Sequence, residues 1–146
     1  MRVYLDLCAI QRPLDTYSNT RIALEAEAVL GILELCDTER LALVSSEVLE
    51  YESEQSILAV RQEHTRAVLA KAQTKVMITL PVEQRAEVFV GMGIKPLDAL
   101  HLASAEAAGV DFFCTCDDRL LRKANHVQGL KVRVMSPIDL VQELEK

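Results

Sequence analysis

Residues 111–135, DFFCTCDDRLLRKANHVQGLKVRVM, contain the pattern that decides the fold class. The apolar segment 111–116 is predicted to form a strand, and Asp117 or Asp118 can cap a helix that continues to about Asn125. Residues 131–135 are predicted to form the next strand. Two strands joined through a helix form a βαβ unit, in which the strands lie parallel in one sheet.

The same alternation of strands and helices continues through the rest of the chain. Residues 21–36 carry apolar side chains at three- and four-residue intervals, which predicts an amphipathic helix packed on a sheet. Pro13, Asp15, Ser18 and Asn19 mark a loop before this helix. We therefore predict an α/β fold with helices on both faces of a central parallel sheet. The other predicted strands are 2–7, 41–45 and 76–80. A helix is predicted over 46–72, with a break near 53–56, and another is opened by Pro81 and stopped by Gly91-Met92-Gly93. Two more helices are predicted, one from Pro96 to Gly109 and one that starts at Pro137.

The length and composition favour one cytoplasmic domain. With 146 residues the chain can bury a hydrophobic core without disulfides, so we expect a single domain over residues 1–146. No apolar run approaches the roughly 20 residues that span a bilayer, and the chain starts on a strand-like segment. Cys8, Cys36, Cys114 and Cys116 are scattered, which favours reduced thiols over a disulfide framework.

The net charge of −6 argues at first against a nucleic-acid partner, because binding to a polyanion usually requires a basic surface. The charge is unevenly distributed, however. Residues 1–60 contain eleven acidic and four basic residues, whereas residues 61–146 contain eleven acidic and twelve basic residues. An acidic first half is compatible with a metal-binding pocket, so the net charge does not exclude a nucleic-acid substrate.

Three aspartates are predicted to lie at one edge of the sheet. Asp6 closes the first strand, Asp117 follows the fourth strand, and Asp98 lies in the first turn of the helix opened by Pro96. Ligand sites of open parallel sheets form outside the carboxyl ends of the strands. Each aspartate alone can be a helix cap or a turn residue, but their common location favours a functional site.

Helical geometry selects a fourth acid from the glutamates of residues 46–54. Glu52 follows Val48 by four residues and Leu49 by three, so it shares their inward-facing side of the helix. Glu50 and Glu54 lie further around the helix, and Glu47 belongs to its first turn. Glu52 is therefore the best candidate.

Four clustered carboxylates repel one another, and a hard divalent cation relieves this repulsion. Mg²⁺ and Mn²⁺ prefer oxygen ligands, and they can contact phosphate oxygens and activate water. The sequence therefore favours phosphodiester hydrolysis at a Mg²⁺ or Mn²⁺ site formed by Asp6, Glu52, Asp98 and Asp117.

Four segments in chain order resemble the acidic motifs of PIN domains. They are Tyr-Leu-Asp at 4–6, Ser-Ser-Glu-Val-Leu-Glu-Tyr-Glu at 45–52, Leu-Asp-Ala-Leu-His-Leu-Ala at 97–103 and Thr-Cys-Asp at 115–117. PIN domains, which include the VapC-type toxins of toxin–antitoxin pairs, are generally Mg²⁺- or Mn²⁺-dependent ribonucleases. The resemblance thus implies a PIN-like three-layer α/β/α sandwich, and metal-binding or water-activating roles for Asp6, Glu52, Asp98 and Asp117.

The resemblance also implies an RNA substrate, an antitoxin protein as partner and a homodimer. A shifted alignment of the second motif nominates Glu47 instead of Glu52. Many PIN domains have Thr or Ser and then Ser or Asn after the first aspartate, whereas this chain has Leu7 and Cys8, with Thr115 as another polar neighbour. The alternative function is a PIN-like module that binds RNA or protein without catalysis.

Other residues have both a functional and a structural interpretation. Cys114 and Cys116 suggest zinc, but further ligands at suitable spacing are missing, so buried core residues are the simpler interpretation. His101, one turn after Asp98, either contacts a phosphate or that carboxylate, or is a packed helix residue. Some basic residues either contact phosphates or form a solvated face. They are Arg12, Arg119, Arg122 and Lys123.

Overall fold

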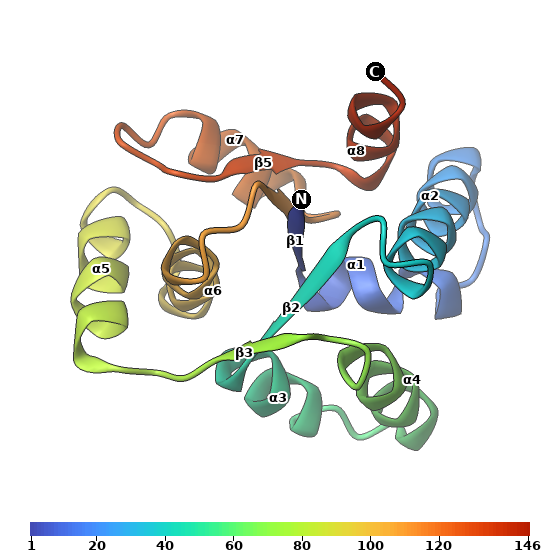
Figure 1. Cartoon of the computed structure of the whole chain (residues 1–146), viewed down its shortest axis with the longest axis horizontal. Helices are drawn as coiled ribbons and strands as arrows, with labels where there is room; N and C mark the ends of the chain where they lie inside the picture. Colours follow the sequence, from blue (N-terminus) through green and yellow to red (C-terminus); the bar gives the residue numbers. More distant parts are fainter.

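The computed structural model describes residues 1–146, and a five-stranded sheet with only parallel strand pairs lies at its centre. The strands follow the order β3-β2-β1-β4-β5 (Figure 1). Their bounds are β1 (Arg2–Leu5), β2 (Ala42–Ser46), β3 (Thr74–Val76), β4 (Phe112–Cys114) and β5 (Arg133–Met135). The predicted parallel sheet is confirmed.

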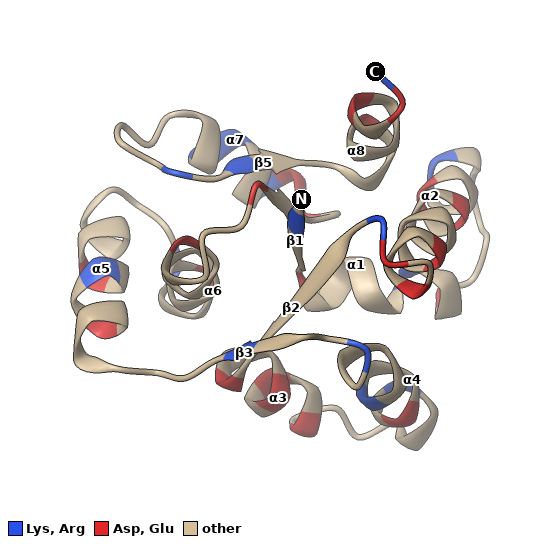
Figure 2. Cartoon of the chain, viewed as in Figure 1, with Lys and Arg blue, Asp and Glu red and all other residues tan.

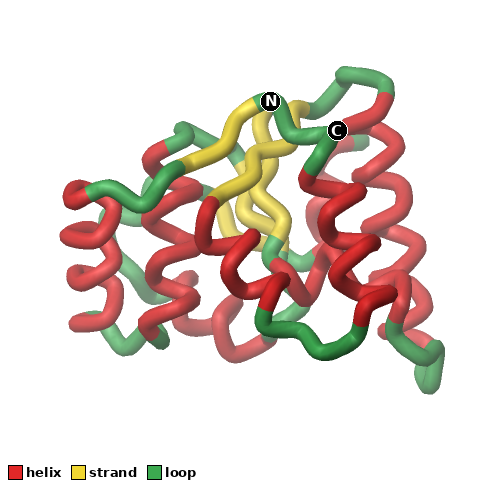
Figure 3. The backbone as a smooth tube through the Cα atoms, turned by 90° about the horizontal axis from the view of Figure 1, so that it is seen from below, coloured by secondary structure: helices red, strands yellow, loops and turns green.

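Helices cover both faces of the sheet. Figure 1 shows α5 and α6 on one side and α2, α4 and α8 on the other, and Figure 3 shows the strands enclosed between helices. This arrangement confirms the three-layer α/β/α sandwich. The helices are α1 (Leu7–Gln11), the 3-10 helix η1 (Arg12–Leu14), α2 (Thr20–Asp37), α3 (Glu47–Glu54), α4 (Ala59–Leu69), α5 (Leu80–Gly91), α6 (Pro96–Ala107), α7 (Asp118–Asn125) and α8 (Pro137–Leu144). None of these helices is both long and apolar enough to cross a membrane.

The strand order changes direction at β1. From β1 the chain proceeds outward to β2 and β3, and then returns through α5 and α6 to β4 on the other side of β1. Leu5 is the register partner of Cys114, and the Asp6 amide donates to the Cys114 carbonyl at 2.9 Å. The carboxyl ends of β1 and β4 are thus adjacent, which is where open parallel sheets bind their ligands.

The segment after Asp6 is helical, so the predicted loop there is partly wrong. Asp6 caps α1 because its Oδ1 atom accepts from the Leu7 amide at 2.9 Å, and Ala9 and Ile10 are buried beneath the sheet edge. Residues 12–14 add one 3-10 turn. A helix of five residues is too short to show the apolar periodicity that reveals longer helices.

Strands β1, β4 and β5 are shorter than predicted, and two further elements have displaced boundaries. The predicted helix 46–72 is interrupted at residues 55–58, close to the break anticipated near residues 53–56. The predicted strand 76–80 is instead β3 at residues 74–76, because the Thr79 hydroxyl accepts from the Val82 amide and α5 already begins at Leu80.

Candidate metal centre

Asp6 lies at the centre of the site between β1 and β4. Its Oδ2 atom accepts from the Thr115 hydroxyl at 2.8 Å and from the Cys8 thiol at 3.4 Å. The Cys8 sulfur and the Thr115 oxygen are themselves 3.3 Å apart. Thr115 supplies the hydroxyl contact that the Leu7-Cys8 dipeptide lacks, so the unusual first motif still leaves Asp6 firmly oriented.

Glu52 approaches Asp6 from α3, whereas Glu47 does not. One carboxylate oxygen each from Asp6 and Glu52 and a ring nitrogen of His101 all lie within 4.8 Å of one another. Glu47 instead accepts from the amide of Ile78, in the connection after β3, at 2.8 Å. The geometry therefore favours Glu52 over Glu47 as the second acid.

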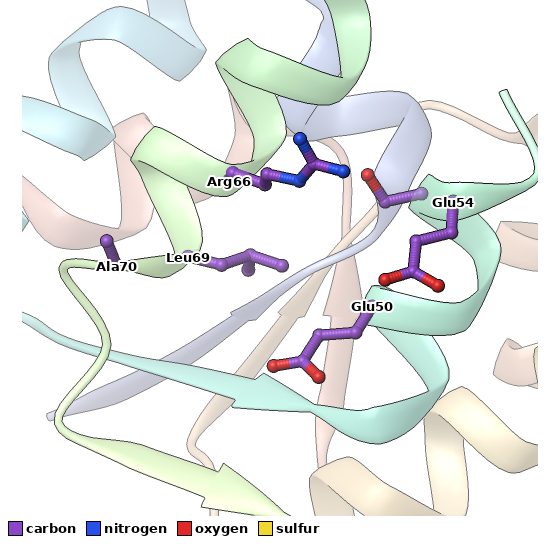
Figure 4. Close-up of a pocket in the computed structure, with 6 residues that line it drawn as sticks. Glu50, Glu54, Arg66, Leu69 and Ala70 are labelled. Carbon is purple, nitrogen blue, oxygen red and sulfur yellow. The ribbon is translucent and has the colours of Figure 1, made fainter. Parts of the chain in front are cut away.

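Glu50 and Glu54 of α3 face α4. A hollow of about 330 Å³ lies between these helices (Figure 4), and none of the four candidate acids lines it. Figure 2 shows the acidic residues gathered along α3. Because Glu52 turns toward α6 while Glu50 and Glu54 turn toward α4, helical geometry separated these side chains correctly. The hollow is lined by Glu50, Ser53, Glu54, Arg66, Leu69 and Ala70.

Asp98 and Asp117 lie beside this group but outside the tight set of atoms. They line one small hollow together. Asp117 caps α7, since its Oδ1 atom accepts from the amides of Arg119 at 2.9 Å and Leu120 at 3.3 Å. The structure thus brings Asp6 and Glu52 close enough to bind one ion, and it places Asp98 and Asp117 at the border of this site.

Electrostatics connect Asp98 to the other acids. The pKa of Asp98 is raised to about 6, mainly by burial and then by the charges of Asp6, Asp117 and Glu52, while His101 acts in the opposite direction. Carboxylates that lie this close together without a neutralising positive charge are typical of a cation site. Most of the donor atoms are oxygens, which suit Mg²⁺ or Mn²⁺ better than zinc. Neither Cys114 nor Cys116 belongs to the set, and both are buried.

The raised pKa of Asp98 predicts a pH dependence of stability for the metal-free protein. The folded state holds the Asp98 proton up to about pH 6, whereas the ordinary value for the carboxyl is 3.8. Stability should therefore fall as the pH rises from about 4 to about 6, because ionisation is less favourable in the folded state. Urea unfolding in EDTA should show a smaller fall of the unfolding free energy with pH for Asp98→Asn than for the wild type. The same pH dependence in both proteins would contradict the raised pKa of Asp98.

Two of the predicted basic residues, Arg119 and Lys123, lie at the site. They line the hollow beside Asp98 and Asp117 together with Lys95, which was not among the predicted residues. Arg12 instead forms ion pairs with Asp15 at 2.9 Å and Glu25 at 3.3 Å, and Arg122 does not line the hollow. Lys95 directly precedes the Pro96 helix start, which is the signal that could have identified it.

His101 is more than a packed helix residue. Its Nε2 atom lies 3.1 Å from Glu52 Oε1, and its Nδ1 atom lies 2.6 Å from the Tyr4 hydroxyl. Burial lowers the pKa of His101, but the hydrogen bond with Glu52 and the nearby carboxylates raise it above its ordinary value overall. His101 is buried as in the structural interpretation, and its carboxylate partner is Glu52 on another helix rather than Asp98 one turn away.

Comparisons with known proteins agree with this geometry. The PIN domain family model matches residues 5–126, while curated protein sequences give no significant match. The fold is similar to that in the crystal structure of VapBC2 from Rickettsia felis bound to a promoter DNA fragment, with a TM-score of 0.61, 12% identity, and coverage of 93% of this chain and 98% of that chain. PAE2754 from Pyrobaculum aerophilum is similar with a TM-score of 0.54, 20% identity, and coverage of 99% and 98%. Because the family model matches residues 5–126, which contain all four candidate acids, and the sheet is parallel as predicted, the chain belongs to the PIN domain family.

Proposed function

We propose that this protein is a divalent-metal-dependent endoribonuclease that hydrolyses phosphodiester bonds in RNA. The observation that carries the proposal is the convergence of Asp6 and Glu52 within 4.8 Å at the carboxyl edge of the sheet. Asp98, whose pKa is raised by burial and by the charges of these acids, borders the pair. PIN domains are generally nucleases, and membership of this family supports the proposal.

Different residues of the site have different roles in the proposed reaction. Asp6 and Glu52 would supply carboxylate oxygens to the ion, and the Thr115 hydroxyl holds Asp6 in place. Bound Mg²⁺ or Mn²⁺ supplies water activation and stabilises the charge on the phosphate and leaving oxygen. Asp98 is suited to accept a proton from the attacking water at its carboxylate, because its pKa lies closer to neutrality than that of an ordinary aspartate.

Basic residues at the same hollow explain how an acidic site can accept RNA. Lys95, Arg119 and Lys123 lie around Asp98 and Asp117, where they can contact the phosphates next to the cleaved bond. Attraction by these cations opposes the repulsion between the carboxylates and the RNA backbone. Single-stranded or loop RNA is the expected substrate, because unpaired segments fit a cleft.

Cleavage of RNA should require a divalent cation. Incubation with a mixture of structured RNAs should give products in Mg²⁺ or Mn²⁺, no products in EDTA, and products again after excess Mn²⁺ is added. Equal cleavage in EDTA would reject the metal mechanism. Cleavage of no RNA under any condition would favour the alternative function, a PIN-like RNA- or protein-binding module without catalysis.

We further propose that the enzyme is the toxin of a toxin–antitoxin pair and forms a homodimer. The fold similarity to a VapBC2 structure supports this role. An antitoxin that covers the acidic site would prevent access of RNA. A small protein should co-purify with the enzyme from its native host, whereas harmless expression of a demonstrably active enzyme would contradict a toxin role.

A further inference from the structure

A chain of buried hydrogen bonds lies directly behind Glu52. The Ser46 hydroxyl is 2.7 Å from the Tyr4 hydroxyl, which is 2.6 Å from His101 Nδ1. His101 Nε2 then reaches Glu52 Oε1 at 3.1 Å. Tyr4, Ser46 and His101 have no exposed surface, and they come from β1, β2 and α6, whereas Glu52 lies on α3.

The hydrogen-bond partners determine the direction of this chain. Ser46 Oγ accepts from the Leu49 amide at 3.1 Å, so the only acceptor for its own proton is the Tyr4 oxygen. The Tyr4 proton must then be donated to His101 Nδ1. His101 consequently carries its proton on Nε2 and donates it to the Glu52 carboxylate.

The reverse direction leaves a buried group without a partner. If His101 Nδ1 donated to Tyr4, Tyr4 would donate to Ser46, and the Ser46 proton would have no acceptor. A buried unsatisfied donor costs about 1–3 kcal/mol, so the first direction is favoured. Hydrogen bonds that run in one direction also polarise and strengthen one another.

We propose that Tyr4 and Ser46 hold the neutral ring of His101 as the tautomer that is protonated on Nε2, and that His101 is a positioning residue that orients Glu52 toward the metal. In this arrangement Nε2 is a donor, so His101 itself is not a metal ligand although it lies within 4.8 Å of the carboxylate oxygens. The inference deepens the proposed function and rests on it for the metal. Hydrogen bonds from such supporting residues fix the orientation of metal-binding carboxylates.

The protonation pattern can be measured without metal or RNA. Long-range ¹H–¹⁵N correlation spectra of the metal-free protein, at an alkaline pH where the imidazole is neutral, distinguish a protonated from an unprotonated ring nitrogen. We expect His101 to show a protonated Nε2 and an unprotonated Nδ1. Protonation at Nδ1, or rapid exchange between the two forms, would overturn the inference.

A matched pair of variants tests the positioning role. His101→Gln keeps an amide donor that can reach Glu52, whereas the shorter side chain of His101→Asn places its amide near the former Nδ1 position and cannot. Titration with Mn²⁺ alone, followed by calorimetry, should give near wild-type affinity for His101→Gln and a loss of about 10–100-fold for His101→Asn. Equal affinities of both variants and the wild type would overturn the role.

Two further variants separate positioning from packing. Ser104→Ala on the same helix removes a buried hydroxyl that has no hydrogen-bond partner, and it should leave Mn²⁺ affinity unchanged.

Tyr4→Phe keeps the stacking on Phe113 but removes the donor to Nδ1, so it should weaken Mn²⁺ binding several-fold even if His101→Asn does not fold. Unchanged affinity in Tyr4→Phe would overturn the chain of hydrogen bonds as an orienting device. Absence of Mn²⁺ binding by the wild type would reject the proposed function and the positioning role, whereas the spectrum would still decide the His101 form.

Discussion

The Asp98→Asn variant should lose RNA cleavage by at least about 100-fold, the lower range for loss of a general acid or base, while its metal-free form is as stable as the wild type or more stable. The amide preserves the size of the side chain but cannot be ionised. It therefore removes one negative charge from a site where Asp6, Asp117 and Glu52 already raise the pKa of Asp98. Mn²⁺ should stabilise the variant less than the wild type, because the same charge favours cation binding.

Thermal melts with and without Mn²⁺, combined with the RNA assay, distinguish this expectation from a structural role. A helix-capping Asp98 that only complements the dipole of α6 predicts a stability loss of about 0.3–1 kcal/mol with activity retained. Cleavage near the wild-type rate by Asp98→Asn would remove Asp98 from the catalytic set.

The Glu52→Gln variant should lose Mn²⁺ binding and RNA cleavage, whereas Glu47→Gln should retain both. A carboxylate oxygen of Glu52 lies within 4.8 Å of one of Asp6, so the substitution would remove a charged oxygen from the proposed ion site. Its effect on Mn²⁺ affinity should exceed the 10–100-fold cost that is typical of a supporting residue. In Glu47→Gln, the amide oxygen can still accept from the Ile78 amide, so the connection after β3 keeps its hydrogen bond.

The two variants are a matched pair, because both glutamates lie on the same helix, α3, and both are changed to the same neutral residue. Calorimetric titration with Mn²⁺ and the RNA assay give two independent measurements. Activity lost in Glu47→Gln but kept in Glu52→Gln would show that the second motif was assigned to the wrong glutamate.

The sequence by itself determined the fold class and the edge of the sheet where the acids lie. Alternating strand and helix patterns require only local information, namely apolar periodicity and capping residues. Parallel strands direct their carboxyl ends to one edge, so the positions of Asp6 and Asp117 followed from the order of elements. Glu52 was separated from Glu50 and Glu54 in the same way, because the angle between side chains on one helix is fixed.

Only the tertiary structure decided which side chains contact one another across this edge. His101 could be paired on local grounds with Asp98, three residues away, but its partners are Tyr4, 97 residues away, and Glu52, 49 residues away. Such contacts depend on the relative placement of α3, α6 and β1, which no local pattern encodes. The start of α5 at Leu80 and the short helix α1 were likewise set by individual capping hydrogen bonds and by burial against the sheet. Periodicity and spacing therefore specify elements and their order, whereas the partner of each buried polar group is selected by the need to satisfy its hydrogen bonds within the packed core.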